Sequence, residues 1–283
     1  MAEISLKGVS YFHGKGTPYE IKALDSVDLD IEQGAITGII GHTGSGKSTL
    51  VELFNGILKP AEGTVSIDGE DIWAKPKEIR GVRFRVGLVM QYPESQLFEE
   101  TIRQDIAFGP KNMGLSEEEI NERVLEAARF VGLDSDILDK SPFDLSGGQK
   151  RRAAIAGIIA MRPEVLILDE PAAGLDPAGR ESIFANIVDY KEKTGSTVVI
   201  VSHSMEDMAR YCDRVVVMSG GKIIMNGSRD EVFSDADRLG GAGLDIPQIT
   251  KLMLLLKGKG IDVNAGIYTS DAAYRELAAL FGK

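Results

Sequence analysis

Cysteine and histidine are scarce in this sequence of 283 residues. The single cysteine, Cys212, cannot form a disulfide within the chain, and we expect it to be a small buried side chain. The three histidines, His13, His42 and His203, lack the spacing of metal ligands, so we expect no zinc site. The start of the chain also lacks the basic and apolar segments of a signal peptide. Together these absences predict a cytoplasmic protein.

Long apolar runs and an excess of basic charge are also missing. The longest apolar stretch, residues 153–161, is closed by Arg152 and Arg162 and is too short to cross a bilayer. The chain carries 32 basic and 43 acidic residues, a net charge of -11, which disfavours non-specific binding to nucleic acid or anionic lipid. With 43% hydrophobic and 27% charged residues, the composition is typical of a soluble globular protein, and we expect no nucleic-acid partner.

A glycine-rich segment follows a short apolar run at residues 36–40, which we interpret as a buried strand. Gly41, four further residues and then Gly46, Lys47 and Ser48 match a phosphate-binding loop, in which backbone N–H groups wrap a polyphosphate. Glycine is needed because a Cβ would block the close approach of the anion. We therefore expect this segment to bind nucleotide through Gly41, Gly44, Ser45, Gly46, Lys47, Ser48 and Thr49.

The helix expected after this loop adds its own chemistry. A helix that opens at Lys47 directs unpaired N–H groups and the positive end of its dipole toward the anion. Lys47 is expected to reach the β- and γ-phosphates, and Ser48 offers its hydroxyl to Mg²⁺. The segment therefore predicts a phosphate site that also takes a metal ion.

A second glycine-rich segment, which contains a Gly-Gly pair, stands at the start of another predicted helix. In residues 145–152, Leu-Ser-Gly-Gly-Gln-Lys-Arg-Arg, Ser146 is a good N-cap and Gly147 and Gly148 open the helix start. Such a helix end is an anion site much like the first one. The chain thus carries two predicted phosphate-binding helix ends.

Charged side chains follow two further apolar runs. One run, residues 165–168, ends in Asp169 and Glu170, and another, residues 197–201, is followed by Ser202 and then His203. Strands that are apolar on both faces lie inside a parallel sheet, and ligands bind beyond their carboxyl ends. We expect Asp169 to contact Mg²⁺ and Glu170 to act as a base or to position attacking water. His203 at the same sheet edge is expected to reach the γ-phosphate.

The order of the predicted elements indicates an α/β fold. Residues 3–34 contain strands with little helix, and a helix is expected from Lys47 to about Leu58. Residues 93–161 are predicted to form a mostly helical insert, in which Ser116 and Glu119 make a capping box at a helix start.

The remainder of the chain returns to strands and then to helices. Asp176 is expected to be an N-cap before Pro177, and Gly220 and Gly221 to lie in a hairpin. Further helices are predicted at residues 247–256 and 270–281, the last capped by Ser270. We therefore predict a P-loop NTPase fold with a RecA-like core, an N-terminal antiparallel β subdomain, a helical insert and a small C-terminal helical extension. The predicted bounds are an ATPase domain at 1–228, with its core at 1–92 and 162–228 and its helical subdomain at 93–161, and an extension at 229–283.

Over residues 3–228 the ordered motifs resemble the ATPase subunits of ABC transporters, and Leu-Ser-Gly-Gly-Gln at 145–149 is the most specific of them. The resemblance implies head-to-tail pairs that sandwich ATP, with Mg²⁺ as cofactor. Ser146 and Gly148 would then contact the γ-phosphate held by the partner's phosphate loop. The first helix end and the second would belong to different composite sites.

The same resemblance assigns roles to single residues. It implies that Gln91 senses Mg²⁺ and the attacking water, that Glu170 is the catalytic base and that His203 clamps the γ-phosphate. Tyr11, in a predicted strand, becomes a candidate to stack on adenine, although an aromatic residue in a strand can equally be part of the core. The set implied to contact nucleotide also includes Gly147, Gln149 and Asp176.

A narrower resemblance is to the energy-coupling factor ATPases, which include the cobalt-importer type. It rests on the segments at 16–20, 91–98, 107–112 and 141–149 and on the C-terminal extension. Within that group the chain is similar to the second ATPase of heterodimeric members, with Met90 and Ala172 where Phe and Thr are common. The resemblance implies import of vitamins or transition-metal ions through separate membrane subunits.

Three partners follow from this resemblance, which also places the chain peripherally at the cytoplasmic face of the membrane. A second ABC ATPase subunit is expected, in a heterodimer rather than a homodimer, and a substrate-binding membrane subunit is reached only indirectly. The transmembrane coupling subunit would be contacted through residues 92–98, where Glu94 would pair with an arginine of that subunit. The extension would hold two ATPases together by burying Leu252, Leu255 and Leu256.

Other classes remain as alternatives. A soluble ABC-type mechanical ATPase, such as a DNA-repair or translation factor, usually carries two cassettes or long coiled-coil inserts, whereas this chain has one cassette and a short insert. The ATPase of another ABC importer class would share the motifs. A P-loop kinase or GTPase would leave residues 145–149 unexplained, and the chain has no Asn-Lys-x-Asp guanine motif.

Overall fold

The N-terminal residues form an antiparallel sheet in the computed structural model, which describes residues 3–282. Along the second strand Val27, Leu29 and Ile31 are buried while Asp28 and Asp30 are exposed, as their alternation predicts. The strand order is β2-β1-β4-β5. These strands are β1 (Ile4–His13), β2 (Ile21–Ile31), β4 (Glu62–Ile67) and β5 (Glu70–Asp71).

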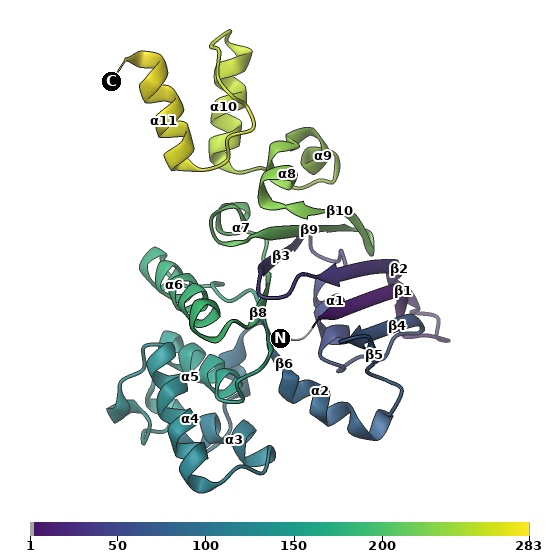
Figure 1. Cartoon of the computed structure of the whole chain (residues 1–283), viewed down its shortest axis with the longest axis vertical. Coiled ribbons are helices and arrows are strands. Elements are labelled where there is room, and N and C mark those ends of the chain that lie inside the picture. The colour runs from purple at the N-terminus through teal and green to yellow at the C-terminus, as the bar shows by residue number, and fades with distance from the viewer. Residues whose placement is uncertain (1–2, 283) are drawn as a thin grey trace.

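A six-stranded sheet forms the centre of the molecule, in the order β10-β9-β3-β8-β7-β6 (Figure 1). All neighbouring pairs are parallel except β9 with β10, which form the predicted hairpin. Every residue of β3, β6, β7 and β8 is buried. Their carboxyl ends share one edge of the sheet, where ligands of such folds bind. The strands are β3 (Ile36–Gly41), β6 (Val86–Val89), β7 (Val165–Asp169), β8 (Thr197–Val201), β9 (Arg214–Ser219) and β10 (Lys222–Ser228).

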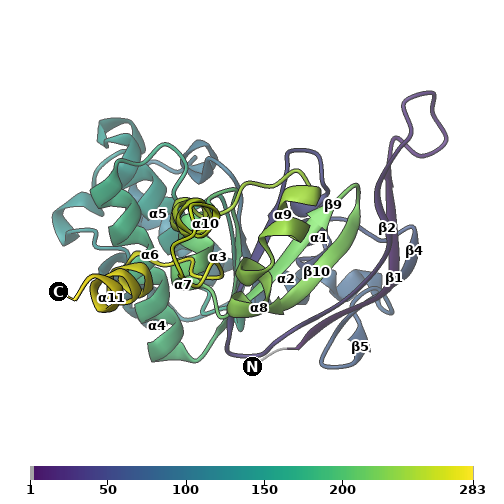
Figure 2. The same cartoon turned by 90° about the horizontal axis from the view of Figure 1, so that it is seen from above.

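Two apolar cores lie on the two faces of this sheet. Val165 and Ile167 of β7 belong to one core and Leu166 and Leu168 to the other, because successive side chains of a strand point to opposite faces. The first core joins the sheet to α1 (Lys47–Phe54) and the N-terminal sheet, and the second joins it to α6 (Pro177–Thr194), α7 (Met205–Tyr211) and the helical insert. Figure 2 shows the N-terminal sheet and the insert on opposite sides of the centre. The predicted fold class is confirmed.

Early in the chain, the helices differ from the prediction at two points. Helix α1 ends at Phe54 rather than near Leu58, because Asn55 donates its side-chain N–H to the Val86 carbonyl and Gly56 adopts a φ of +68°. Helix α2 (Ile79–Arg85), preceded by the turn η1 (Pro76–Glu78), was not predicted. It has only seven residues, none of them fully buried, which is too few for a clear apolar period in the sequence.

The insert between β6 and β7 is helical, as expected. The capping box predicted at the start of α4 is only half formed. Ser116 accepts a hydrogen bond from the Glu119 N–H, but the Glu119 carboxylate instead pairs with Arg123, 2.8 Å away. The elements of the insert are η2 (Pro93–Gln96), α3 (Ile102–Asn112), α4 (Glu117–Phe130), η3 (Ser135–Ile137), η4 (Pro142–Asp144) and α5 (Gly147–Ile159).

The C-terminal segment consists of two parts. Val232, Phe233 and Leu239, from α8 (Arg229–Ser234) and α9 (Ala236–Gly241), are buried in the core shared with the sheet. Helices α10 (Gln248–Gly258) and α11 (Ser270–Phe281) extend away from the molecule with a small core of their own (Figure 1). The predicted cap of α11 is wrong by one residue, since the hydroxyl of Thr269 accepts the bond from the Ala272 N–H. Across residues 3–282 no helix is long and apolar enough to cross a membrane.

Candidate nucleotide-binding site

The predicted phosphate-binding loop joins β3 to α1. Gly44 and Gly46 have φ of +79° and +101°, in the left-handed region that favours glycine. A Cβ on Gly46 would lie 2.6 Å from the Ala23 carbonyl oxygen, so this position accepts no other residue without backbone movement. Helix α1 has no side-chain cap. The N–H groups of its first turn are therefore left for an external acceptor.

Lys47 and Ser48, the first residues of α1, both face the sheet edge. The Lys47 ammonium donates to the carbonyls of Gly41 and His42, at 2.7 Å and 3.1 Å. Burial lowers the pKa of Lys47, while the charges of Glu170 and then Asp169 oppose that shift. A half-buried ammonium held against the loop and facing two carboxylates is placed to bind an anion carried by the same loop.

The Ser48 hydroxyl donates to the Asp169 carboxylate across 3.0 Å. Asp169 ends β7 and is 9% exposed, and burial raises the pKa of its carboxyl against the opposing bond from Ser48. A hydroxyl and a carboxylate are hard oxygen donors, which suit Mg²⁺. Within residues 3–282 no cluster of three or more His, Cys, Asp or Glu could hold a metal by itself. The pair therefore fits an ion that also takes ligands from phosphate and water.

Glu170 and His203 are in direct contact, which the sequence did not predict. The Glu170 Oε1 atom lies 2.7 Å from His203 Nδ1, and the Ser202 hydroxyl donates to the other carboxylate oxygen across 3.4 Å. The sequence placed both residues at the same sheet edge but gave no signal for this pairing. Glu170 has a φ of +52°, and its N–H bonds to the Val201 carbonyl at 2.9 Å, which fixes this strained conformation between β7 and β8.

Gln91 lies just beyond β6, the neighbour of β7 in the sheet. It is exposed and stands at the same carboxyl edge as Asp169. Glu94, three residues later, is paired with Arg151 of the same chain, with Nε 3.2 Å from Oε2. The structure therefore contradicts our interpretation of Glu94 as a free charge that awaits an arginine of a membrane subunit.

The second predicted anion site is a well-formed helix start. Ser146 caps α5 by accepting from the Gln149 N–H, and the Gln149 side chain accepts from the Ser146 N–H at 3.0 Å. A Cβ on Gly147 or Gly148 would meet nothing within 4 Å, so packing does not require glycine there. No hydrogen bond or ion pair in the described part of the chain joins residues 146–149 to the loop at 41–49. The two helix ends are therefore separate within one chain.

The other predicted nucleotide contacts lie around this centre. Tyr11 is half-buried and meets His13 edge-to-face, with ring centroids 5.1 Å apart. His13, which the sequence analysis did not select, is 3.1 Å from the Thr49 hydroxyl and so ties β1 to α1. The Ser45 hydroxyl is buried and, within residues 3–282, has no hydrogen-bond partner. Asp176 caps α6 by accepting from the Gly179 N–H at 2.7 Å.

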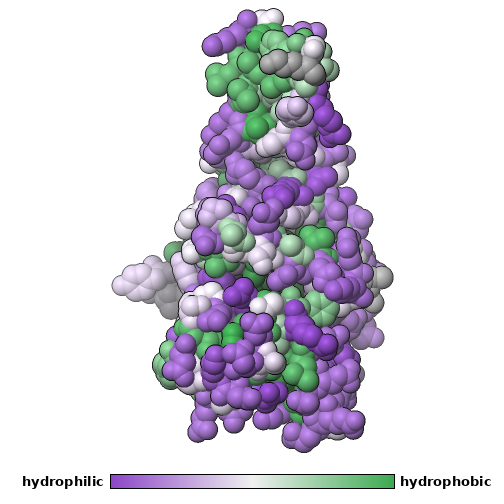
Figure 3. Space-filling model, turned by 90° about the vertical axis from the view of Figure 1, so that its left-hand side faces the viewer, coloured by the Kyte–Doolittle hydropathy of each residue, from purple (hydrophilic) through white to green (hydrophobic). Residues whose placement is uncertain are grey.

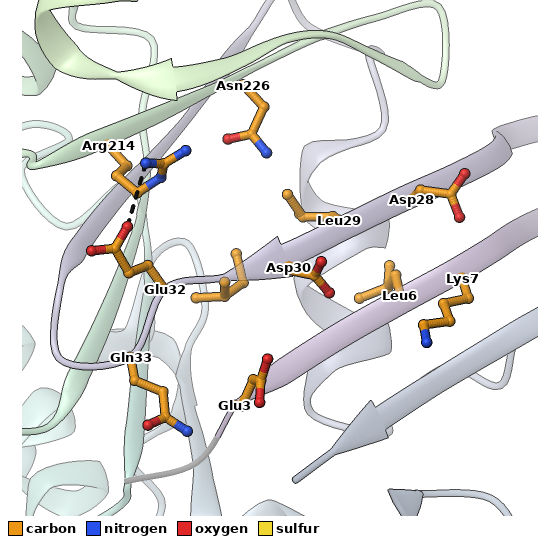
Figure 4. Close-up of a pocket in the computed structure, with 11 residues that line it drawn as sticks. Glu3, Leu6, Lys7, Asp28, Leu29, Asp30, Glu32, Gln33, Arg214 and Asn226 are labelled. Atoms are coloured by element: carbon orange, nitrogen blue, oxygen red, sulfur yellow. Dashed lines mark ion pairs between the residues drawn. The ribbon is translucent and has the colours of Figure 1, made fainter. Parts of the chain in front are cut away.

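A large hollow of about 920 Å³ lies away from this centre. It opens between β1, β2 and the start of β9, where Arg214 pairs with Glu32 at 3.3 Å (Figure 4). In the parallel register of β3 and β9, Thr37 lies opposite Arg214 and Gly41 lies opposite Met218. Arg214 begins β9, so the hollow is at the amino ends of these two strands. The phosphate-binding loop is at their carboxyl ends. This hollow is therefore not the nucleotide site.

The phosphate-binding loop, the Ser48–Asp169 pair and the capped Gly-Gly helix start on this fold define an ATP-binding cassette. The family model for ABC transporters matches residues 24–173. The chain is 52% identical to an energy-coupling factor transporter ATP-binding protein, EcfA2, of Clostridium acetobutylicum, over 97% of this chain and 96% of that one. It is 53% identical to the protein of the same name from Acetivibrio thermocellus, over 99% of each chain.

Solved structures agree. The cbiO1 protein of Clostridium perfringens, described as part of the ABC transporter complex cbiONQ, has a TM-score of 0.75 at 40% identity over 89% of this chain and 98% of that one. A dimeric ATP-binding cassette in a post-hydrolysis state with ADP and Pi has a TM-score of 0.72 at 30% identity, over 80% of this chain and 98% of that one. The chain belongs to the ABC transporter family, within its energy-coupling factor transporter ATP-binding proteins, and is a transport-coupled ATPase.

Proposed function

We propose that this chain hydrolyses Mg²⁺-ATP as one half of a head-to-tail pair and powers uptake of vitamins or transition-metal ions through separate membrane subunits. The observation that carries the proposal is the separation, in one chain, of the two helix ends that are predicted to bind anions. The start of α1 lies beside Asp169 and Glu170, whereas the start of α5 makes no bond to that loop. A pair of chains facing each other would bring the α5 start of one to the loop of the other.

The loop residues and Lys47 would bind the phosphates, and Tyr11 would stack on adenine. Ser48 and Asp169 would hold Mg²⁺, with Gln91 beside it, and the ion would neutralise charge that develops on the phosphates. Glu170 would accept a proton from attacking water, because its carboxylate is held in place by His203 and Ser202. In addition, the exposed ring of His203 would contact the γ-phosphate.

The partner in the pair would be a second ABC ATPase subunit, so that the complex is a heterodimer. Ser146, Gly147, Gly148 and Gln149 of this chain would then contact the γ-phosphate in the partner's loop. The open space around Gly147 and Gly148 supports this role, since their own chain's packing does not explain them. Asp176 would lie at the same interface, at the start of α6.

The exposed end of the α10–α11 hairpin would add a nucleotide-independent contact between the two ATPases. Leu255 is 65% exposed, Tyr274 75% and Phe281 64%. Figure 3 shows hydrophobic side chains gathered at this end of the molecule. Leu252 is also exposed, whereas Leu256 packs against the hairpin's own small core. Because a patch of this kind marks an interaction site, we assign the contact to this hairpin rather than to all of residues 229–283.

The transmembrane coupling subunit would dock in a groove of about 500 Å³ between α2, α3 and α5. Phe98 and Phe108 line it and are 65% and 44% exposed. Asp105 also lines it and is 91% buried, with one carboxylate oxygen that has no partner in the described residues. We therefore move the contact for a basic side chain from Glu94 to Asp105, since an uncompensated buried oxygen favours a cation opposite it.

This arrangement would hold the chain peripherally at the cytoplasmic face of the membrane, in contact with the substrate-binding subunit only through the coupling subunit. The test is to purify the tagged chain from membranes of its own host in mild detergent and to identify what elutes with it. We expect a second ABC ATPase and a protein with several membrane spans in stable proportion. Recovery of the chain only as a soluble homodimer that hydrolyses ATP would contradict the proposal and favour a soluble mechanical ATPase.

A further inference from the structure

Arg151 is a buried arginine that joins its own helix, α5, to two other segments of the chain. It lies in the second turn of α5 and is 4% exposed. Its Nε is 3.2 Å and its Nη2 3.4 Å from the two carboxylate oxygens of Glu94, and its Nη1 donates to the carbonyl of Ala173. A guanidinium has a rigid set of donors, so it can hold two partners at once in fixed directions.

Each of these segments leads to a predicted nucleotide contact. Glu94 is three residues beyond Gln91, and the residues between them include Tyr92, at a φ of +56°. Ala173 lies in the turn between Glu170 and Asp176, and its N–H bonds to the Glu170 carbonyl at 3.1 Å. Arg151 itself is carried by the helix that Ser146 caps. Only a few residues separate each contact of Arg151 from Gln91, Glu170 or Ser146. A movement of one of these segments is therefore passed to the others through few bonds.

The surroundings of Arg151 explain why loss of its contact with Glu94 should disturb the neighbouring segments. A hollow of about 410 Å³ lies between the start of α5 and residues 174–176, and Arg151 lines it. Residues of α5 line one side of this hollow and residues 174–176 line another, and Arg151 reaches from α5 to the carbonyl of Ala173 beside them. Glu94 is only partly exposed, with 28% of its side chain accessible. Loss of either charge therefore leaves the other partly desolvated and unmatched.

We propose that Arg151 is a positioning residue that sets Gln91, the turn after Glu170 and the capped start of α5 in one fixed relation. Through Glu94 it holds the loop that carries the water-sensing Gln91. Through Ala173 it holds the turn that follows Glu170, so the acid and the water sensor are aligned together. Because it belongs to α5, it also ties this alignment to the surface that meets the other ATPase. The inference rests on the proposed roles of Gln91, Glu170 and Ser146.

A double-mutant cycle on the ATPase of the purified membrane complex tests this inference. The variants are Glu94→Gln, Arg151→Met and the two combined, with Arg151→Lys as the conservative change. We expect kcat to fall about tenfold in each single variant, with the KM for ATP within about twofold of wild type. The double variant should lose no more than the worse single one, because each single change already removes the same ion pair. Arg151→Lys should be intermediate, since one ammonium cannot reproduce the fork.

The matched control is the exposed pair Arg210 and Glu181, which are 2.9 Å apart with both side chains over 60% exposed. Arg210→Met and Glu181→Gln should leave kcat unchanged. Melting curves accompany each variant. A wild-type kcat in Arg151→Met, or losses in the two single variants that multiply in the double, would overturn the inference. So would a fall in melting temperature with an unchanged kcat per folded molecule. If the wild-type complex itself fails to hydrolyse ATP, the proposed function fails and this inference with it.

Discussion

The Glu170 carboxylate is nearly buried, with 12% of its side chain exposed, while its partner His203, 2.7 Å away, is 76% exposed. One group is thus sheltered from solvent and the other faces the space beyond the sheet edge. Their contact links the end of β7 to the end of β8. It holds the acid in one orientation and leaves the second imidazole nitrogen free of that bond.

Replacing Glu170 by Gln should therefore abolish the base and leave the binding surface intact. We expect kcat to fall by about 10²–10⁴-fold, while ATP still binds. Single-turnover hydrolysis and equilibrium ATP binding on the same preparation separate the two effects. Lys47→Ala is the contrasting variant, since loss of a charge-assisted contact should weaken ATP binding about tenfold or more. Near-normal turnover by Glu170→Gln would mean that another group takes the proton.

Asp169 should oppose folding stability at neutral pH. Burial raises the pKa of its carboxyl, so the folded chain binds the proton more tightly than the unfolded chain. Its contribution to stability is therefore greatest at low pH and is lost as the pH rises through the raised pKa. Asp169→Asn removes this cost, and a gain of about 1 kcal/mol would raise the melting temperature by about 2–4 °C. In this variant Lys47 still faces the Glu170 carboxylate, which opposes the burial shift of the Lys47 pKa more strongly than Asp169 does.

Melting curves without nucleotide at neutral and mildly acidic pH check this expectation. The difference in melting temperature between Asp169→Asn and wild type should become smaller as the pH falls. The same variant should lose Mg²⁺-dependent hydrolysis, because an amide is a poorer ligand than a carboxylate. A variant that melts lower than wild type at every pH would show that the Ser48–Asp169 contact stabilises the fold more than burial destabilises it.

Asp105→Asn should weaken the membrane complex without changing ATP affinity. One Asp105 oxygen accepts from the N–H groups of Phe98 and Glu99, at 3.1 Å and 3.3 Å, and an Asn oxygen can keep both bonds. The change therefore removes the charge and preserves the loop. We expect the complex to dissociate about tenfold more readily in detergent, as for loss of a buried charge pair.

The matched control for that variant is Asp139→Asn. Asp139 is an exposed acid of the same insert, 73% accessible and paired with Arg103. It should leave the complex and transport unchanged. If Asp105→Asn supports uptake into reconstituted vesicles at the wild-type rate, the groove is not the docking site of the coupling subunit.

The α10–α11 hairpin should hold the ATPase pair together without nucleotide. Leu255→Asp with Phe281→Asp places charges on two exposed positions and leaves the hairpin's own core, which includes Met253, untouched. We expect the pair to dissociate in ATP-free buffer, by light scattering at a fixed concentration. Tyr19→Asp, at a position 84% exposed in the loop after β1, is the control. Wild-type mass for the double variant would leave the hairpin with another role.

Local sequence patterns were enough to establish the class of protein. Motifs whose chemistry is local, such as the loop at residues 41–48, the cap at Ser146 and the carboxylates after residues 165–168, were readable because each depends on neighbours in the chain. The buried parallel strands were equally readable from their apolar runs. Those patterns also placed Asp169, Glu170 and His203 at one sheet edge, since carboxyl ends of parallel strands coincide.

Which of these charges meet depends on how distant parts of the chain pack together. Glu94 and Arg151 are 57 residues apart in the chain, so no local pattern could show that one neutralises the other. The buried, half-satisfied Asp105 and the division of the C-terminal segment after α9 also depend on contacts between distant elements. Helix α2 was not predicted because its seven residues, none of them fully buried, are too few for a clear apolar period. Pairing of charges and burial are properties of the packed chain, and they determine which residues are free to meet a partner.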